Sequence, residues 1–224
     1  MNKLMTMCTA ILFIATLHGT AAEELKKVDL SIGINPGQEY THTKWFVVIP
    51  MKLTPQMAFW VEDSRGRFVS SLFITEKAAE GSWKGGGDVT RPEALPVYFH
   101  RYESAKSIDT LSGATPKQKD AKSREWSRTL HLKPGEYRLM GEVNSSFDYN
   151  AAFQKQEGNV NGQPSLIYAA EFKVAPSGSA WPTSLTLQPI GHGDPQGKNG
   201  NIVYTTEGLT TALELVDKVH ASLK

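Results

Sequence analysis

Residues 109–115 read Asp-Thr-Leu-Ser-Gly-Ala-Thr and combine one carboxylate with three hydroxyl side chains. A hydroxyl group can be the acceptor in a phosphoryl transfer, a reaction that depends on positioning and on charge stabilisation by metal ions. Gly113 lets the backbone approach another molecule closely, and Ala114 adds little bulk. The pattern D-x-x-S-G-A-T occurs by chance in roughly one chain in a thousand of this length. The alternative is an ordinary Ser-Gly turn whose Thr caps or pairs with a strand.

This pattern resembles the flavinylation motif of exported FMN-binding proteins, such as the flavin-carrying subunits of sodium-pumping quinone reductases. In those families a periplasmic flavin transferase cleaves FAD and attaches FMN through a phosphoester to the last Thr or Ser of the motif. The resemblance implies that Thr115 is the acceptor and Asp109 the leading acid. Ser112, Gly113 and Ala114 are then the small neighbours of the acceptor.

Most of the chain also resembles a bacterial family of predicted periplasmic proteins of unknown function. The similarity lies in residues 57–63 with Gly66, and in residues 91–97, 132–137, 142–144, 147–150 and 161–166. Members often carry a similar S-G-A-T segment and accompany flavin transferases and membrane reductases of the PepSY type. The motif departs from that of the quinone reductases at Lys117, where those proteins often have a hydroxyl residue.

Together the two resemblances imply an exported flavoprotein that carries FMN covalently and transfers electrons, rather than a stand-alone enzyme. A flavin transferase and a membrane reductase of the PepSY type would be its partners. The alternative is a cofactor-free periplasmic binding or interaction module, because a β-sandwich scaffold hosts many recognition functions.

The histidines beyond residue 22 are scattered along the chain, with no helical pair and no H-E-x-x-H pattern. No G-x-S-x-G motif of a serine hydrolase occurs. His192 and Asp194 could offer two metal ligands, but a solvated turn is the favoured interpretation. His100 is expected to be a packed residue rather than a flavin contact.

Three aromatic side chains could stack on an isoalloxazine ring: Trp83, Tyr98 and Trp126. For each of them, packing in the core or anchoring of a loop is the favoured interpretation.

The first 22 residues have the order of a secretory signal peptide. Lys3 precedes a mostly apolar run over residues 4–17, and small residues follow at 19–22. The apolar run is too short to span a bilayer as a helix of the mature protein. We expect cleavage near Ala22, a periplasmic location, and loss of the only cysteine, Cys8. A cysteine-free exported chain suits a bacterial periplasm.

Composition excludes several other classes of protein. The chain of 224 residues has 24 Lys and Arg against 23 Asp and Glu, so it lacks the basic face of a nucleic-acid binder and the polybasic segment of a membrane anchor. Hydrophobic residues make up 40%, enough to bury a core. Residues 23–224 are expected to form a single domain that is not itself embedded in a membrane.

The elements that must position the motif are mainly strands. Residues 28–34 alternate between apolar and other side chains, and residues 57–62 and 68–75 flank a turn, which predicts a hairpin. Further strands are expected at residues 44–50, 125–132, 136–143 and 166–174. The sequence therefore predicts a mainly β protein, an antiparallel immunoglobulin-like β-sandwich.

Long irregular regions are expected at residues 78–118, 145–164 and 176–201. A short C-terminal helix is expected over residues 210–223. Thr210 would be its N-cap, and its apolar stripe would comprise Leu215, Val216, Val219 and Leu223.

Overall fold

The computed structural model describes residues 24–46, 48–83, 87–88, 91–105, 112–113, 124–157 and 162–224. The predicted signal peptide lies outside these residues, and so do Asp109, Ala114 and Thr115 of the motif. Predictions that concern them remain inferences from the sequence.

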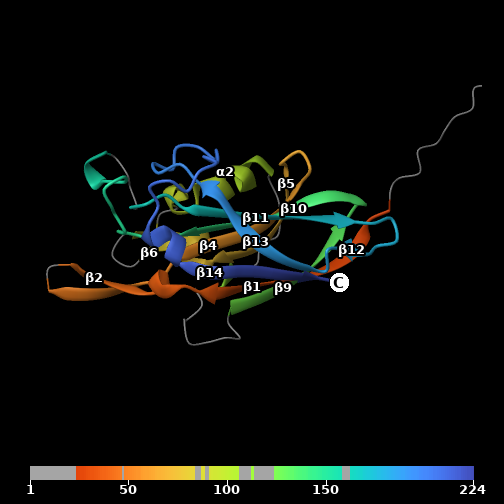
Figure 1. Ribbon diagram of the computed structural model, residues 1–224, viewed down its shortest axis with the longest axis horizontal. Coiled ribbons are helices and arrows are strands. Elements are labelled where there is room, and N and C mark those ends of the chain that lie inside the picture. The colour runs from red at the N-terminus through yellow and green to blue at the C-terminus, as the bar shows by residue number, and fades with distance from the viewer. Residues whose placement is uncertain are drawn as a thin grey trace, which may run out of the picture.

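One ten-stranded sheet dominates the described residues, in the order β8-β5-β4-β10-β11-β13-β14-β1-β9, with β12 paired to β11 (Figure 1). Its strands are β1 (Lys26–Pro36), β4 (Gln56–Asp63), β5 (Phe68–Thr75), β8 (Ser112–Gly113), β9 (Glu125–Leu132), β10 (Gly135–Asn144), β11 (Leu166–Val174), β12 (Ala180–Trp181), β13 (Ser184–His192) and β14 (Val216–Leu223). Neighbouring strands run antiparallel, except that β8 runs parallel to β5.

Shorter elements surround this sheet. Two separate hairpins are formed by β2 (His42–Phe46) with β3 (Ile49–Leu53), and by β6 (Ser82–Trp83) with β7 (Gly87–Asp88). The helical elements are η1 (Gln38–Tyr40), α1 (Glu76–Glu80), η2 (Pro92–Ala94), α2 (Pro96–Ala105), η4 (Lys155–Glu157) and η5 (Thr211–Glu214). No helix among the described residues is long and apolar enough to cross a membrane.

The sheet folds back over itself and encloses the main core. Figure 1 shows β4, β10 and β11 in one layer and β14, β1 and β9 in the other, with β13 crossing between them. The two layers are bridged by Trp126 of the end strand β9, whose ring stacks on Phe73 of β5, the strand next to the opposite end, with 4.0 Å between the ring centroids. The predicted antiparallel β-sandwich is confirmed, and its closure approaches that of a barrel.

Alternation in the sequence correctly identifies the inward face of β1. Val28, Leu30, Ile32 and Ile34 are all buried in the main core. The predicted β4–β5 hairpin is also confirmed. Its turn is held by Asp63, whose Oδ1 accepts hydrogen bonds from the backbone N–H groups of the residues two and four positions later.

A second, smaller core lies on the outer face of the sheet, beneath α2. Trp60, Met140 and Ile167 of the sheet pack there with Val97 and Tyr98 of the helix. Strand β4 is therefore buried on both faces, which explains its unbroken apolar run.

The predicted C-terminal helix is wrong. Only Thr211–Glu214 is helical, as a short 3-10 turn, and Val216–Leu223 forms strand β14 between β13 and β1. The four apolar residues fit a helical stripe, but Val219, Ala221 and Leu223 also recur every second residue and are all buried. Backbone pairing with two neighbouring strands decides between the two periods.

Three other expectations also need correction. Residues 44–50 form parts of two strands and the turn between them rather than one strand. The region 176–201 contains β13, because Leu185 and Leu187 alternate into the core although Pro189 and Gly191 interrupt the pattern. The region 78–118 contains α2, which begins with a proline, a residue well suited to the first turn of a helix.

A pair of adjacent substitutions distinguishes the strand from the helix at the C-terminus. Ala221 is 4% exposed and lies opposite Ile32 and Leu185, whereas Ser222 is exposed. Ala221→Asp places an unpaired charge in the core and should lower the free energy of unfolding by about 3 kcal/mol or more. Ser222→Asp should change it by less than about 1 kcal/mol. Urea denaturation measures both, and a larger effect at position 222 would contradict the strand.

Candidate functional site

The described part of the D-x-x-S-G-A-T motif lies at one edge of the large sheet. Ser112 and Gly113 form β8 and pair with Ile74 and Thr75 at the end of β5. Strand β8 is the last in the strand order, so no further described strand covers its other side. Two of the predicted neighbours of the acceptor, Ser112 and Gly113, are thus paired at an edge of the sheet.

The end of β5 that receives β8 is held by a buried polar contact. The Thr75 hydroxyl donates to Oε1 of Gln56 at 2.8 Å and accepts a hydrogen bond from the backbone N–H of Met57. Thr75 and Gln56 are both buried. Because these polar groups satisfy one another, the strand end is a well-determined attachment point for β8.

Helix α2 precedes the motif in the chain, and its first turn is capped by a buried carboxylate from the sheet. Glu142 of β10 accepts hydrogen bonds from the backbone N–H groups of Val97 (3.2 Å) and Tyr98 (2.7 Å) and from the Ser165 hydroxyl (2.6 Å). A carboxylate is well placed at a helix N-terminus because free N–H groups and the helix dipole meet there. Asn144 adds a hydrogen bond from its Nδ2 to the Ala94 carbonyl.

Burial controls the protonation of this cap. Loss of solvation raises the pKa of the Glu142 carboxyl to about 7, although its three hydrogen bonds act in the opposite direction. The neighbouring chain is closely packed: a Cβ on Gly193 would lie 2.5 Å from the Ser165 hydroxyl oxygen. Position 193 therefore has no room for a side chain larger than glycine's.

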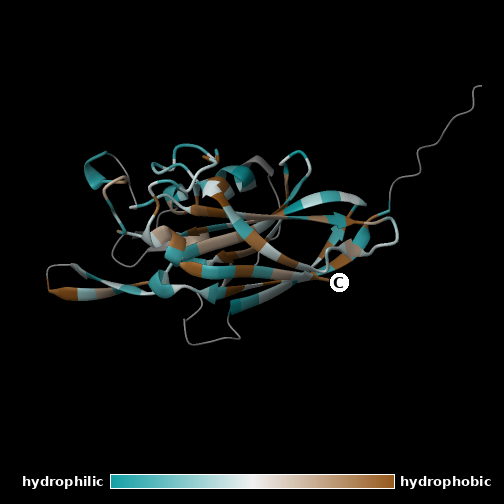
Figure 2. Ribbon diagram, viewed as in Figure 1, coloured by the Kyte–Doolittle hydropathy of each residue, from teal (hydrophilic) through white to brown (hydrophobic). Residues whose placement is uncertain are grey.

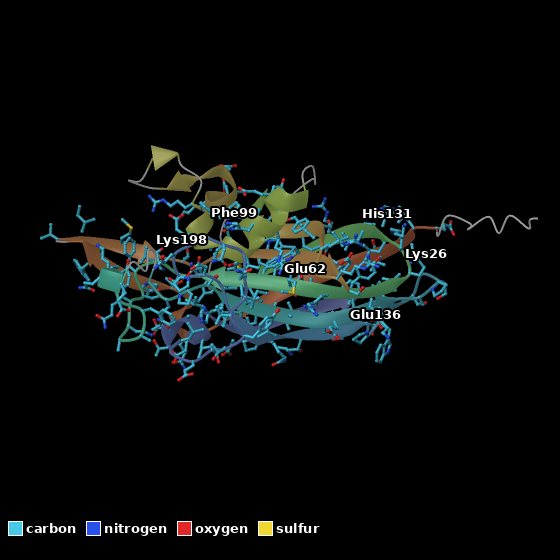
Figure 3. All side chains as sticks on the ribbon, turned by 90° about the horizontal axis from the view of Figure 1, so that it is seen from above. Lys26, Glu62, Phe99, His131, Glu136 and Lys198 are labelled. Atoms are coloured by element: carbon cyan, nitrogen blue, oxygen red, sulfur yellow. The ribbon has the colours of Figure 1, made fainter. Side chains whose placement is uncertain are left out.

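A second buried acid holds the middle of the helix. Glu62 of β4 accepts a hydrogen bond from Nε1 of Trp60 at 2.9 Å and lies 3.4 Å from Nε of Arg101 on α2. The Arg101 guanidinium also donates to the carbonyl of Gly66 in the β4–β5 turn. Glu62 lies on the side of the sheet that carries α2 (Figure 3). Two sheet acids, Glu142 and Glu62, therefore fix the helix that leads into the motif.

Two of the candidate flavin-stacking aromatics are engaged within the protein. Tyr98 is buried, shares a hydrogen bond with the Ser71 hydroxyl at 2.9 Å, and stacks on Tyr102. Trp126 stacks on Phe73 across the core. The favoured interpretation as packing residues is confirmed for both. Trp83 lies in β6, and its side chain is outside the described part of the chain.

His100, the candidate flavin contact, and His192, the candidate metal ligand, also make contacts within the protein. Nδ1 of His100 contacts the Pro96 carbonyl oxygen at 2.8 Å, one turn earlier in α2. Nδ1 of His192 contacts the Gly193 carbonyl oxygen, also at 2.8 Å. The Asp194 carboxylate accepts hydrogen bonds from the backbone N–H groups of three residues in its own loop. Within the described ranges, no group of three His, Cys, Asp or Glu side chains could hold a metal ion.

Sequence reasoning missed a polar cluster that joins two loops. Oδ1 of Asp148 accepts from the backbone N–H of Gln163 at 3.0 Å, and Nε2 of Gln163 donates to the Asp148 carbonyl. Burial raises the pKa of Asp148 to about 6, and the nearby His42 acts against this rise. A Cβ on Gly162, which has φ +120°, would lie 2.2 Å from the Asp148 carboxylate. In the sequence, the cluster is indicated only by Gly162 directly before Gln163.

Two buried polar atoms near this part of the chain have no hydrogen-bond partner among the described residues: Nε2 of His42 and Oγ of Ser145. His42 begins β2, and Ser145 directly follows β10. The residue before Asp148, Phe147, accepts a hydrogen bond at its carbonyl from Nζ of Lys44 in β2, so the cluster lies beside the β2–β3 hairpin.

No family model matches this sequence, and neither a curated protein nor a solved structure matches the chain.

The Glu142 cap predicts a specific pH dependence of stability. Its pKa is about 7 in the folded protein against an ordinary 4.5, so its contribution to stability is complete below pH 4.5 and is lost as the pH rises through 7. Between about pH 5 and about pH 8, wild type should lose roughly 2 to 3 kcal/mol more unfolding free energy than Glu142→Gln. Urea denaturation at both pH values measures the difference.

The matched control for this experiment is Glu136→Gln. Glu136 lies on the same strand, but its side chain is largely exposed and ion-paired with Lys173, which lowers its pKa. This variant should keep the pH dependence of wild type between pH 5 and 8. Parallel pH profiles for wild type and Glu142→Gln would show that the buried carboxyl does not titrate in this range.

Proposed function

We propose that this chain is an exported electron-transfer protein that carries FMN covalently on Thr115. The observation that carries the proposal is the motif at residues 109–115, whose pattern resembles that of flavin-acceptor segments. The location of Ser112 and Gly113 at a sheet edge supports it, because an acceptor must enter the active site of a second enzyme.

The support around this edge is rigid in a way that suits a tethered cofactor. Glu142 and Glu62 fix α2, which precedes the motif in the chain. Thr75 fixes the strand end that pairs with Gly113. Thr115 follows Gly113 by two residues. A flavin attached there would be held close to the protein at high effective concentration. A flavin bound without a covalent bond would dissociate and be lost outside the cytoplasm.

The attachment itself is a phosphoryl transfer carried out by a flavin transferase. The Thr115 hydroxyl oxygen would form a bond to the phosphorus of the FMN half of FAD, and the bond from that phosphorus to the bridging oxygen would break. AMP leaves with the electron pair of the broken bond, and the hydroxyl proton passes to a base of the transferase. The chain supplies only the hydroxyl and a backbone small enough to be positioned, at Gly113 and Ala114.

Once attached, the flavin would supply the capacity to accept and donate electrons. Tyr98 and Trp126 are already packed within the protein, so the proposal does not place the ring between them. The ring would instead stay at the edge of the sheet, where redox partners can approach it. A membrane reductase of the PepSY type is the proposed electron donor, and the periplasm the proposed location.

Mass spectrometry of the intact protein tests the proposal. After co-expression with a flavin transferase, wild type should gain the mass of FMN less one water and should be yellow. Thr115→Ala should remain unmodified and colourless, with its midpoint of thermal unfolding within about 2 °C of wild type. Thr110→Ala is the matched control, because it removes another hydroxyl of the same segment and should leave the modification intact.

An unmodified wild type, produced with a transferase that modifies a known acceptor in the same cells, would contradict the proposal. Modification that persists in Thr115→Ala would contradict the assignment of the acceptor. In the first case a cofactor-free binding module becomes the better account.

A further inference from the structure

The β2–β3 hairpin exposes large apolar side chains at its tip. Trp45 is 65% exposed, Val48 77% and Ile49 64%. The hairpin projects from one end of the sandwich, and its tip is hydrophobic (Figure 2). An isolated two-stranded hairpin is marginally stable in water, and clustered exposed apolar side chains indicate an interaction surface.

Positive charge lies directly behind this tip. Residues 42–53 contain two lysines, Lys44 and Lys52, and no acidic residue, and both lysines are exposed. Lys44 pairs with Met51, one pair before the Trp45–Pro50 pair, and Lys52 pairs with Thr43. Each strand therefore carries one lysine between the apolar tip and the base of the hairpin.

The register gives the apolar end a defined length. Beyond Lys44, the pairs Trp45–Pro50 and Phe46–Ile49 lead into the turn. Residues in a strand are spaced by about 3.3 Å, so this apolar end is on the order of 7 to 10 Å long. That length matches the depth of about 5 to 10 Å to which interfacial segments enter a bilayer.

The base of the hairpin is anchored to the sandwich. Nζ of Lys44 donates to the carbonyl of Phe147 at 3.4 Å. The first residue of the hairpin, His42, has its Nε2 buried. The Lys44 contact and the antiparallel pairing of β2 with β3 order the hairpin before its tip meets a surface.

We propose that the tip of the β2–β3 hairpin inserts into the headgroup region of an anionic lipid bilayer and docks this protein on the membrane surface. An apolar tip with a Trp at the interface and cations behind it fits a lipid surface with negative charge. A groove on a protein would not require cations on both strands and the absence of acids. The docking surface is separate from the motif and does not depend on flavin attachment.

Vesicle co-sedimentation tests this proposal with the protein as exported and purified. Wild type should bind vesicles of equal parts phosphatidylglycerol and phosphatidylethanolamine, and should bind phosphatidylcholine vesicles at least about fivefold less. Trp45→Ser should reduce binding at least about fivefold. The double variant Lys44→Glu and Lys52→Glu should reduce it at least about tenfold. Trp181→Ser is the matched control, because Trp181 is 70% exposed elsewhere and its loss should leave binding unchanged.

Insertion has its own spectroscopic signature. Lipids brominated on their acyl chains should quench the tryptophan fluorescence of wild type, and Trp45→Phe should abolish that quenching. Circular dichroism should show that all variants remain folded. Absence of wild-type binding to the anionic vesicles would overturn the proposal. Equal binding of Trp45→Ser and wild type, or a wild-type dimer that this substitution dissociates, would overturn it as well.

Discussion

The buried carboxylate of Glu142 is the interaction on which the outer layer of this protein depends. It lies on a strand at the centre of the sheet and receives two backbone N–H groups from the first turn of α2. Without it, those N–H groups would be buried without partners beneath a helix that covers the second core. Because α2 ends at Ala105, four residues before Asp109, a single acid on the sheet fixes the helix that precedes the proposed acceptor segment in the chain.

Local patterns in the sequence were sufficient to predict much of the sheet but not strands β13 and β14. The inward face of β1 and the β4–β5 hairpin follow from alternation and turn chemistry, which act over a few residues. Strand β14 could not be predicted in the same way, since its apolar residues fit both a helical and an alternating period. Its pairing with β1, nearly two hundred residues earlier, decides its conformation, and no local pattern contains that information.

The candidate site likewise has one part that local sequence patterns predict and one part that depends on long-range contacts. The motif is a local pattern, so its residues can be named from the amino-acid sequence alone. The groups that position it cannot, because Glu142 contacts residues more than forty positions away and Glu62 contacts Arg101 across the interface between helix and sheet. In the sequence, both buried acids resemble ordinary charged residues of a strand. Only the packing of α2 onto the sheet gives them their role.

Peptide mapping of the purified protein tests the central claim most directly. Trypsin cleavage after Lys106 and Lys117 would release residues 107–117, which contain the whole motif. After co-expression with a flavin transferase, the account predicts that flavin fluorescence elutes with this peptide and that fragmentation places the FMN phosphoester on Thr115. Recovery of the peptide without flavin, or with the phosphoester on Ser112, would contradict it.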